Sequence, residues 1–227
     1  KKTHPLKTIK TLCRNKYFIL ITLAFAVIYT SLGLTGGSRI YYAKYVLGDE
    51  MLNSTMTMFN YIPTILTIML IPVFTKRFGK IKALFVGFLF YAAGLVLEIA
   101  GPVNLPMIYT GLVLQGIGHA ALYSCLFAIV GDVVDYSEWK DGIREEGITY
   151  SVTSFGQKIG TGLGTAALGW ILAAGHYDGT AAVQSASAIF AIKGLFLYLP
   201  LVITVIVLII WYLFMGIDKI YPTVRKE

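Results

Sequence analysis

Lys158 is a charged residue inside a long stretch that otherwise carries no charge, from Gly147 to Ala174. Hydroxyl and amide side chains surround it at helical spacing: Tyr150, Thr153, Ser154, Gln157, Thr161 and Thr165. An ammonium group in such a stretch requires a partner or a water-filled cavity, and a polar helix stripe should face a cavity or another helix. This segment is therefore the first candidate for contact with a polar ligand.

A second polar set lies one segment earlier, where Gln115, His119 and Tyr123 follow one another at intervals of four residues. This spacing places the three side chains on one side of a helix. His119 is open to two interpretations. It is either an interior histidine with satisfied hydrogen bonds or a residue that carries a proton.

A charged segment from Gly131 to Gly147 separates these two polar sets. It contains six acids: Asp132, Asp135, Glu138, Asp141, Glu145 and Glu146. A basic turn earlier in the chain contains Lys76, Arg77, Lys80 and Lys82. The acidic segment is either a solvated connector or one side of ion pairs that open and close against the basic turn. In the second interpretation the gating residues are Asp132, Asp135, Glu138, Lys76, Arg77 and Arg144.

The motifs of embedded enzymes and metal sites are missing from the sequence. There is no HExxH or GxSxG motif, and no pair of acids is expected at one depth. Cys13 and Cys125 form no CxxC or Cys/His spacing. We expect no enzyme activity, no cofactor and no metal site.

The composition is that of a membrane protein. Of the 227 residues, 56% are hydrophobic and 14% are charged, and the mean hydropathy is +0.71. Soluble domains carry charges on about a quarter of their residues. The net charge of +7 could suggest nucleic acid, but the chain has too little polar surface for a basic binding face. The expected partner is the lipid bilayer, not nucleic acid.

Six apolar runs are long enough to cross a bilayer, which takes about 20 residues. They are Tyr17 to Ser38, Met56 to Phe74, Ala83 to Ala100, Met107 to Val130, Gly147 to Ala174 and Ile189 to Ile217. The predicted organisation is an N-terminal arm (1–16), an all-α bundle of six transmembrane helices (17–217) and a tail (218–227). The chain has no initiator Met and no signal-peptide pattern, so we expect it to be part of a longer polypeptide.

Basic residues are distributed unequally between the two sides of this arrangement. The arm, the turn after the second run, the segment after the fourth run and the tail together hold 15 of the 19 Lys and Arg residues. Because Lys and Arg favour short cytoplasmic loops, both termini are predicted to be cytoplasmic, in a multi-pass protein of the plasma (inner) membrane. Arg39 and Lys193 are expected near helix ends, where long side chains reach the interface.

The six runs repeat the order polar, polar, apolar. The second triplet enters from the opposite side of the membrane, as in an inverted repeat of three plus three helices. In the fifth run, Gly156, Gly160 and Gly164 remove side chains from one ridge, which lets another helix approach closely. The close contact is either static packing or a sliding surface.

Lys158 is expected near the membrane midplane. It lies 11 residues beyond Gly147, which corresponds to about 16 Å at about 1.5 Å per residue. A charge at this depth costs about 2.5 to 3.5 kcal/mol on insertion scales. No carboxylate of this chain is expected at the same depth, and Glu98 is assigned to the outer end of the third run. We expect the partner carboxylate outside this chain, and the alternative is a lysine that is neutral or bonded to carbonyl groups.

Several segments resemble the glycoside-pentoside-hexuronide cation symporters, the family of the melibiose carrier within the major facilitator superfamily. They are Gly131 to Gly147 followed by Tyr150-Ser151-Val152-Thr153, the Gly36 to Tyr42 segment, and Lys76 to Lys80. The resemblance covers essentially the whole chain. It implies the C-terminal half of a twelve-helix major facilitator fold, with the N-terminal six helices as the missing partner.

The resemblance also implies sugar transport with Na⁺ or H⁺ by alternating access. By position, Lys158 matches a family lysine beside the sugar and cation sites, and Thr153, Ser154 and Gln157 fall on the sugar-facing side. Tyr123 takes a place where the melibiose carrier has tryptophan against the sugar, although it could simply pack. His119 is the sixth candidate substrate-binding residue. Two alternatives stay open: a lipid or other small molecule carried on the same fold, and a membrane-embedded enzyme.

Overall fold

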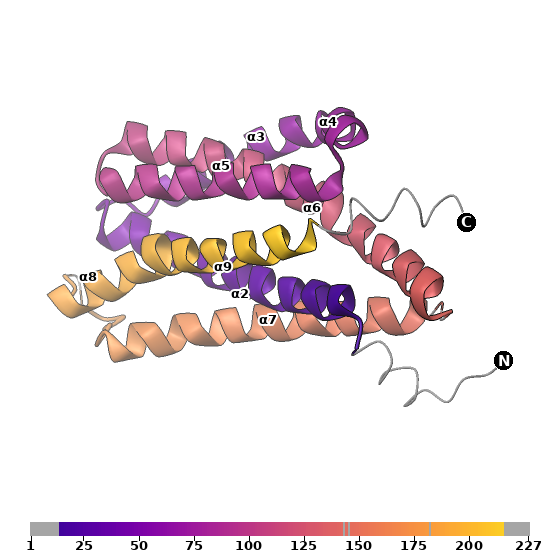
Figure 1. Ribbon diagram of the computed structural model, residues 1–227. Coiled ribbons are helices and arrows are strands. Elements are labelled where there is room, and N and C mark those ends of the chain that lie inside the picture. The colour runs from indigo at the N-terminus through magenta and orange to yellow at the C-terminus, as the bar shows by residue number, and fades with distance from the viewer. Residues whose placement is uncertain (1–13, 143, 145, 182, 216–227) are drawn as a thin grey trace.

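The computed structural model describes residues 14–142, 144, 146–181 and 183–215, and it contains no strand within them. The helices run roughly side by side in one bundle (Figure 1). Their bounds are α2 (Lys16–Tyr45), α3 (Leu52–Ile68), α4 (Ile71–Phe78), α5 (Lys80–Ala100), α6 (Leu105–Asp141), α7 (Glu146–Ala174), α8 (Ala186–Lys193), η1 (Gly194–Tyr198) and α9 (Leu199–Phe214).

Each of the six apolar runs corresponds to a helical segment. Helices α3 and α4 share the second run and are bent by 55° between them, while α8, the π-helical turn η1 and α9 follow one another in the sixth. The last two residues of the predicted sixth run, 216 and 217, lie outside the described residues, as do residues 1–13 of the predicted arm and the whole predicted tail.

Four of the helical segments are long and apolar enough to cross a membrane, and the bent pair α3–α4 is a fifth candidate. Helix α7 is absent from this set although it has 29 residues. Its length would suffice at about 1.5 Å per residue, so its polar residues are what separate it from the others. The chain is an all-α, multi-pass membrane protein.

Two helix ends differ from the sequence expectation. The first run was predicted to end at Ser38, but α2 continues to Tyr45. The charged segment after Val130, for which a solvated connector was one of two interpretations, is helical as far as Asp141, where α6 ends with Gly142 in the left-handed conformation (φ 65°). A hydropathy pattern marks where the apolar stretch ends, and a helix can continue past that point into the polar interface.

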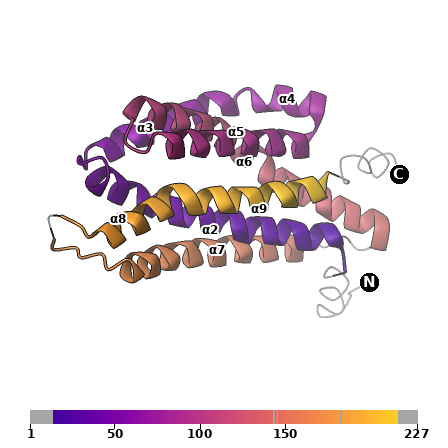
Figure 2. The same cartoon turned by 60° about the vertical axis from the view of Figure 1, so that its left-hand side comes forward.

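The packing of the helices has the symmetry of an inverted repeat. The first helix of one triplet packs against the middle helix of the other: α2 against α7, and α6 against α3. Helix α5 also packs against α6, and α9 lies between α2 and α5, as Figures 1 and 2 show. The predicted three-plus-three arrangement is confirmed.

The glycine ridge of α7 makes a close contact with α2. A side chain on Gly156, Gly160 or Gly164 would meet the main chain of α2 near Thr22, Ala26 and Thr30, respectively. Both helices advance by four residues per contact, so they run parallel. The predicted close approach is therefore confirmed, and its partner is α2.

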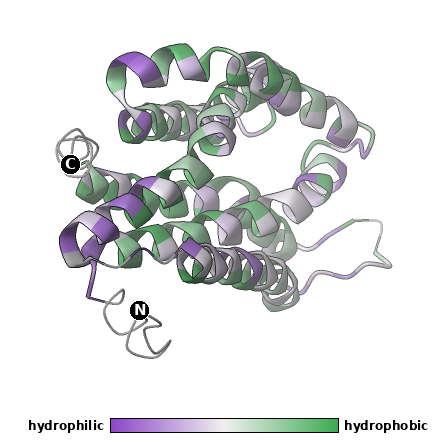
Figure 3. Cartoon of the chain, turned by 90° about the vertical axis from the view of Figure 1, so that its right-hand side faces the viewer, coloured by the Kyte–Doolittle hydropathy of each residue, from purple (hydrophilic) through white to green (hydrophobic). Residues whose placement is uncertain are grey.

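Hydrophobic residues occur on the helices throughout the bundle, as the hydropathy colouring of the ribbon in the end view of Figure 3 shows. They form two buried clusters, one including Phe25 and Trp211 and the other including Tyr42 and Phe196. The first cluster lies at the end where α2 begins and α9 ends, because the rings of Tyr17 and Phe214 are 5.3 Å apart there. Large apolar side chains also cover the outward sides of α3, α5, α7 and α9.

Candidate functional site

A polar cavity of about 230 Å³ lies where α2, α3 and α6 meet. Its lining residues are Leu32, Thr35, Gly36 and Arg39 of α2, Asn53, Thr57, Asn60 and Tyr61 of α3, and His119 and Tyr123 of α6. We call this set the polar cavity. It contrasts with the apolar outward sides of the same helices.

Side-chain bonds to the main chain fix α3 against α6 beside the cavity. The amide nitrogen of Asn60 donates to the Leu112 carbonyl at 3.2 Å, and the Thr64 hydroxyl donates to the Gly116 carbonyl at 3.0 Å. Gly116 is required at this contact, because a side chain there would collide with the Asn60 carbonyl. Some polar residues of the second apolar run therefore hold α3 against α6, and others line the polar cavity.

Arg39 forms part of the cavity wall. One of its terminal nitrogens, Nη1, donates to the Thr57 hydroxyl at 3.2 Å, while its Nε is buried without a partner among the described residues. The expectation that this side chain reaches the membrane interface is wrong. Because α2 continues to Tyr45, Arg39 lies within the helix, and its side chain turns towards α3.

His119 and Tyr123 both lie in the cavity wall. The His119 Nδ1 is 3.3 Å from the Asn60 Oδ1, and the imidazole ring is 5.0 Å from the Tyr91 ring and 5.8 Å from the Tyr123 ring. Tyr123 is 45% exposed. The structure thus brings these two predicted residues together with Arg39, which the sequence interpretation did not place among them.

The polar stripe of α7 consists of Tyr150, Ser154, Gln157, Lys158, Thr161 and Thr165. Lys158, Thr161 and Thr165 are exposed, and Ser154 and Gln157 are half-buried. Lys158 forms no ion pair with any residue that the structure describes. Its predicted partner carboxylate therefore lies outside this part of the chain or is absent.

Thr153 is placed differently from the other candidates on α7. It is fully buried on the side of the helix that packs against α2, and its hydroxyl donates to the carbonyls of Thr149 and Tyr150 at 3.1 and 3.0 Å. Its hydrogen-bonding capacity is therefore used within its own helix. Ser154, Gln157 and Lys158 carry the accessible polar groups of this segment.

The stripe is adjacent to the cavity-lining helix α6. The Tyr150 hydroxyl donates to the Phe127 carbonyl at 3.5 Å, one turn beyond Tyr123. Helix α2 contacts both α7 and the cavity. The polar cavity and the stripe of α7 therefore lie on neighbouring helices.

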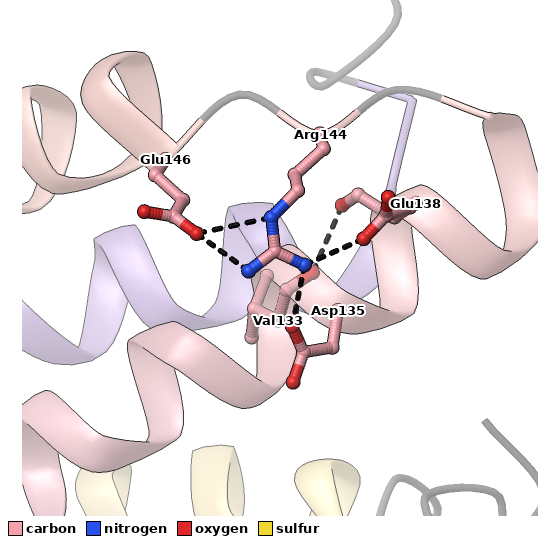
Figure 4. Close-up of polar contacts among 6 residues, drawn as sticks. Val133, Asp135, Glu138, Arg144 and Glu146 are labelled. Carbon is pink, nitrogen blue, oxygen red and sulfur yellow. Dashed lines mark hydrogen bonds and ion pairs between the residues drawn. The ribbon is translucent and has the colours of Figure 1, made fainter. Parts of the chain in front are cut away.

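Four of the six predicted gating residues form ion pairs, in two separate groups. Lys80 pairs with Asp132 at 2.6 Å, whereas Lys76 and Arg77 are exposed and pair with no acid among the described residues. Arg144 lies between Glu146 on one side and Asp135 and Glu138 on the other (Figure 4). The hydrogen bonds that Arg144 donates to the carboxylates of Glu138 and Glu146 raise the pKa of Arg144.

Both groups connect parts of this one bundle. Arg144 bridges the end of α6 and the start of α7, and Lys80 with Asp132 bridges α5 and α6. Ion pairs at exposed positions such as Arg144 contribute little to stability on average. No group of three or more His, Cys, Asp or Glu side chains within the described ranges could hold a metal ion.

Comparison with known proteins identifies the family. Residues 1–219 match the family described as MFS/sugar transport protein. The chain belongs to this family. This family match also confirms the resemblance to the glycoside-pentoside-hexuronide cation symporters.

Individual relatives of this family are transport proteins. The isoprimeverose transporter of Lactiplantibacillus pentosus is 32% identical over all of this chain and 47% of its own length. The glucuronide carrier protein homolog of Escherichia coli is 26% identical over 97% of this chain and 48% of its own length. A putative sulfoquinovose importer of Salmonella typhimurium is 32% identical over 71% of this chain. The chain spans about half the length of the curated relatives that it matches over its full extent.

Proposed function

We propose that this chain is one half of a secondary active transporter that carries a sugar (a glycoside, pentoside or hexuronide) together with Na⁺ or H⁺ by alternating access. The observation that carries this proposal is the polar cavity beside the polar stripe of α7, on a bundle whose other outward sides are apolar. Hydroxyl, amide and guanidinium groups are suited to the hydroxyl groups of a sugar.

The geometry also supports a role for a second half. Lys158 is exposed on α7, although the sequence places it near the membrane midplane. A charge at that depth needs a cavity or a partner. We infer that the stripe of α7 and the polar cavity face another six-helix half of the same polypeptide, which supplies the other wall and a carboxylate for Lys158.

The orientation follows from the distribution of charge. The start of α2 and the end of α9 lie at one end of the bundle, together with the Lys80–Asp132 pair. Basic residues collect at this end, so we place it on the cytoplasmic side of the plasma membrane. The candidate gating residues, Asp132, Asp135, Glu138, Lys76, Arg77 and Arg144, would then act at the cytoplasmic opening.

A transport assay with the full-length protein in sealed vesicles tests the proposal. The vesicles would be offered a panel of glycosides, pentosides and hexuronides under an imposed Na⁺ or proton gradient. We expect at least one sugar to accumulate against its gradient and to draw the coupling ion with it. Transport of a lysolipid with no transport of any sugar would instead support an amphiphilic substrate and overturn the proposal.

A further inference from the structure

Glu98 of α5 is a fully buried acid outside the polar cavity. Its side chain is 0% exposed and lies between α5 and α6. The Oε1 atom accepts a hydrogen bond of 2.7 Å from the Gln115 amide nitrogen, and the Oε2 atom is buried without a partner. The sequence interpretation placed this residue at the outer end of its helix and assigned it no role.

The surroundings of Glu98 do not stabilise a negative charge. Within the described part of the chain, no basic side chain lies at ion-pair distance from it, and Arg39 is the one basic group whose charge acts on it. A buried carboxylate with one hydrogen bond and no cation is very costly, and such a group binds a proton instead. This arrangement therefore favours the neutral form of Glu98.

The other titratable groups near Glu98 come from three helices, α5, α6 and α2. They are Tyr91 on α5, His119 on α6, and Tyr42 and Arg39 on α2. Tyr42 donates its hydroxyl to the Pro102 carbonyl and is thereby occupied. This leaves Arg39 as the group able to offset a charge on Glu98.

Polar side chains lie along the contact between α5 and α6, between Glu98 and the polar cavity. Because α5 and α6 run antiparallel, Glu98 lies beside Gln115, and Tyr91 lies beside His119 one turn further along α6. Gly94 and Gly111 let the two helices approach at this point, since a side chain on Gly111 would come within 2.6 Å of the Glu98 Cγ. His119 then contacts the cavity residue Asn60.

Arg39 and Glu98 therefore each keep an unused hydrogen-bonding atom. The Arg39 Nε and the Glu98 Oε2 are both buried without partners. Their unused atoms would become complementary if Glu98 lost its proton. The two atoms are therefore suited to an exchange in which Arg39 leaves Thr57 in the cavity wall and pairs with Glu98.

We propose that Glu98 is a proton-binding site of the transporter and that Arg39 responds to its protonation. On proton release the O–H bond of Glu98 breaks, the carboxylate keeps the electron pair, and the proton passes to solvent in the polar cavity. Arg39 then turns from Thr57 towards the carboxylate. This inference rests on the proposed transport function and names the proton as the coupling ion.

Infrared spectroscopy of the purified full-length protein tests the protonation state without any need for transport. The wild type should show the carbonyl stretch of a protonated carboxyl group at neutral pH, and Glu98→Gln should lose it. Glu50→Gln is the control, because Glu50 is an exposed acid paired with Lys44. An unchanged band in Glu98→Gln would overturn the proposal.

A second variant covers the possibility that Glu98→Gln does not fold. Gln115→Leu keeps the acid but removes the hydrogen bond to its Oε1. The carbonyl stretch of Glu98 should then move to higher frequency, because a hydrogen bond to a carbonyl oxygen weakens the C=O bond. A band at the wild-type frequency in Gln115→Leu would show that the protonated group is not Glu98.

Transport measurements separate this inference from the proposed function. Glu98→Gln should lose sugar accumulation driven by a proton gradient but keep exchange of sugar between equal concentrations on both sides. Full accumulation by Glu98→Gln, or accumulation driven by Na⁺ alone, would overturn the proton site. If the wild type carries no sugar while the infrared result holds, the proposed function fails and the protonated state of Glu98 stands.

Discussion

Lys80 and Asp132 join the start of α5 to α6 through an ion pair. The Lys80 Nζ lies 2.6 Å from the Asp132 Oδ1 and 2.9 Å from its Oδ2. The side chain of Asp132 is 10% exposed and that of Lys80 is 35% exposed. Since α5 and α6 pack closely against each other, the pair links two helices of one bundle, and we expect it to stabilise their contact.

Lys80→Met is therefore expected to lower the free energy of unfolding by about 1 to 3 kcal/mol, because it leaves the buried Asp132 carboxylate without this partner. Thermal unfolding of the purified protein in detergent measures the effect. Lys76→Met is the matched control, since Lys76 is exposed on the same basic turn. Equal unfolding temperatures for the two variants would show that the pair contributes nothing to stability.

Gly160→Ala should disrupt the contact between α2 and α7. The added methyl group would meet the Ala26 carbonyl oxygen, and overpacking of this kind costs about 1 to 3 kcal/mol. Gly162→Ala is the control two residues away, where nothing lies within 4 Å of the added group. That variant should be neutral or more stable, by about 0.5 to 1 kcal/mol from helix propensity. Equal stability of Gly160→Ala and Gly162→Ala would show that the contact between α2 and α7 does not require glycine at position 160.

Arg39→Gln should weaken sugar binding, because it removes the guanidinium group from the cavity wall. A hydrogen bond to a charged group contributes about 1.5 to 3 kcal/mol, which corresponds to a loss of affinity of about tenfold or more. Titration calorimetry with the transported sugar measures this change in the full-length protein. Lys44→Gln is the control, because Lys44 lies on the same helix but pairs with Glu50 in the exposed outer turn. A sugar affinity unchanged in Arg39→Gln would remove Arg39 from the site.

Lys158→Ala should abolish coupled sugar accumulation while expression stays near normal. Lys158 is exposed in this half, so its loss creates no cavity, but it strands the carboxylate that we expect in the other half. Lys158→Arg should not restore accumulation fully, since a planar guanidinium differs in shape from a compact ammonium. Uptake assays in whole cells measure both variants.

The control for this prediction is Lys193→Ala, at the end of α8, which should matter far less. Wild-type accumulation in Lys158→Ala would mean that Lys158 has no part in coupling. The candidate site on α7 would then be wrong.

The proposed orientation predicts which residues are accessible from each side. In a protein without native cysteines, single cysteines at Lys76 and Lys140 should react only with reagent on the cytoplasmic side, whereas Val103 and Val183 should react from outside. All four positions are exposed in the structure. Labelling of Lys76→Cys from outside intact cells would contradict the orientation.

The six helical segments and the glycine contact could be predicted because each depends on a local pattern. Long apolar runs form helices in a bilayer, where every backbone hydrogen bond must be made within the segment. The spacing of Gly156, Gly160 and Gly164 likewise indicates a close approach whatever the partner is. The pattern could not show that the partner is α2, because that depends on how the helices pack.

The sequence by itself therefore determined the class of protein, the number of its segments, and the polar stripe of α7 that carries Lys158. Only the tertiary structure placed Arg39 in the polar cavity and buried Glu98 against Gln115. The sequence shows that both charged residues are present but not where their side chains lie. A long side chain near the end of an apolar run can turn outwards to the interface or inwards to a neighbour. The choice is made by helices far away in the sequence, here α3 for Arg39 and α6 for Glu98, because they supply the atoms that each side chain contacts.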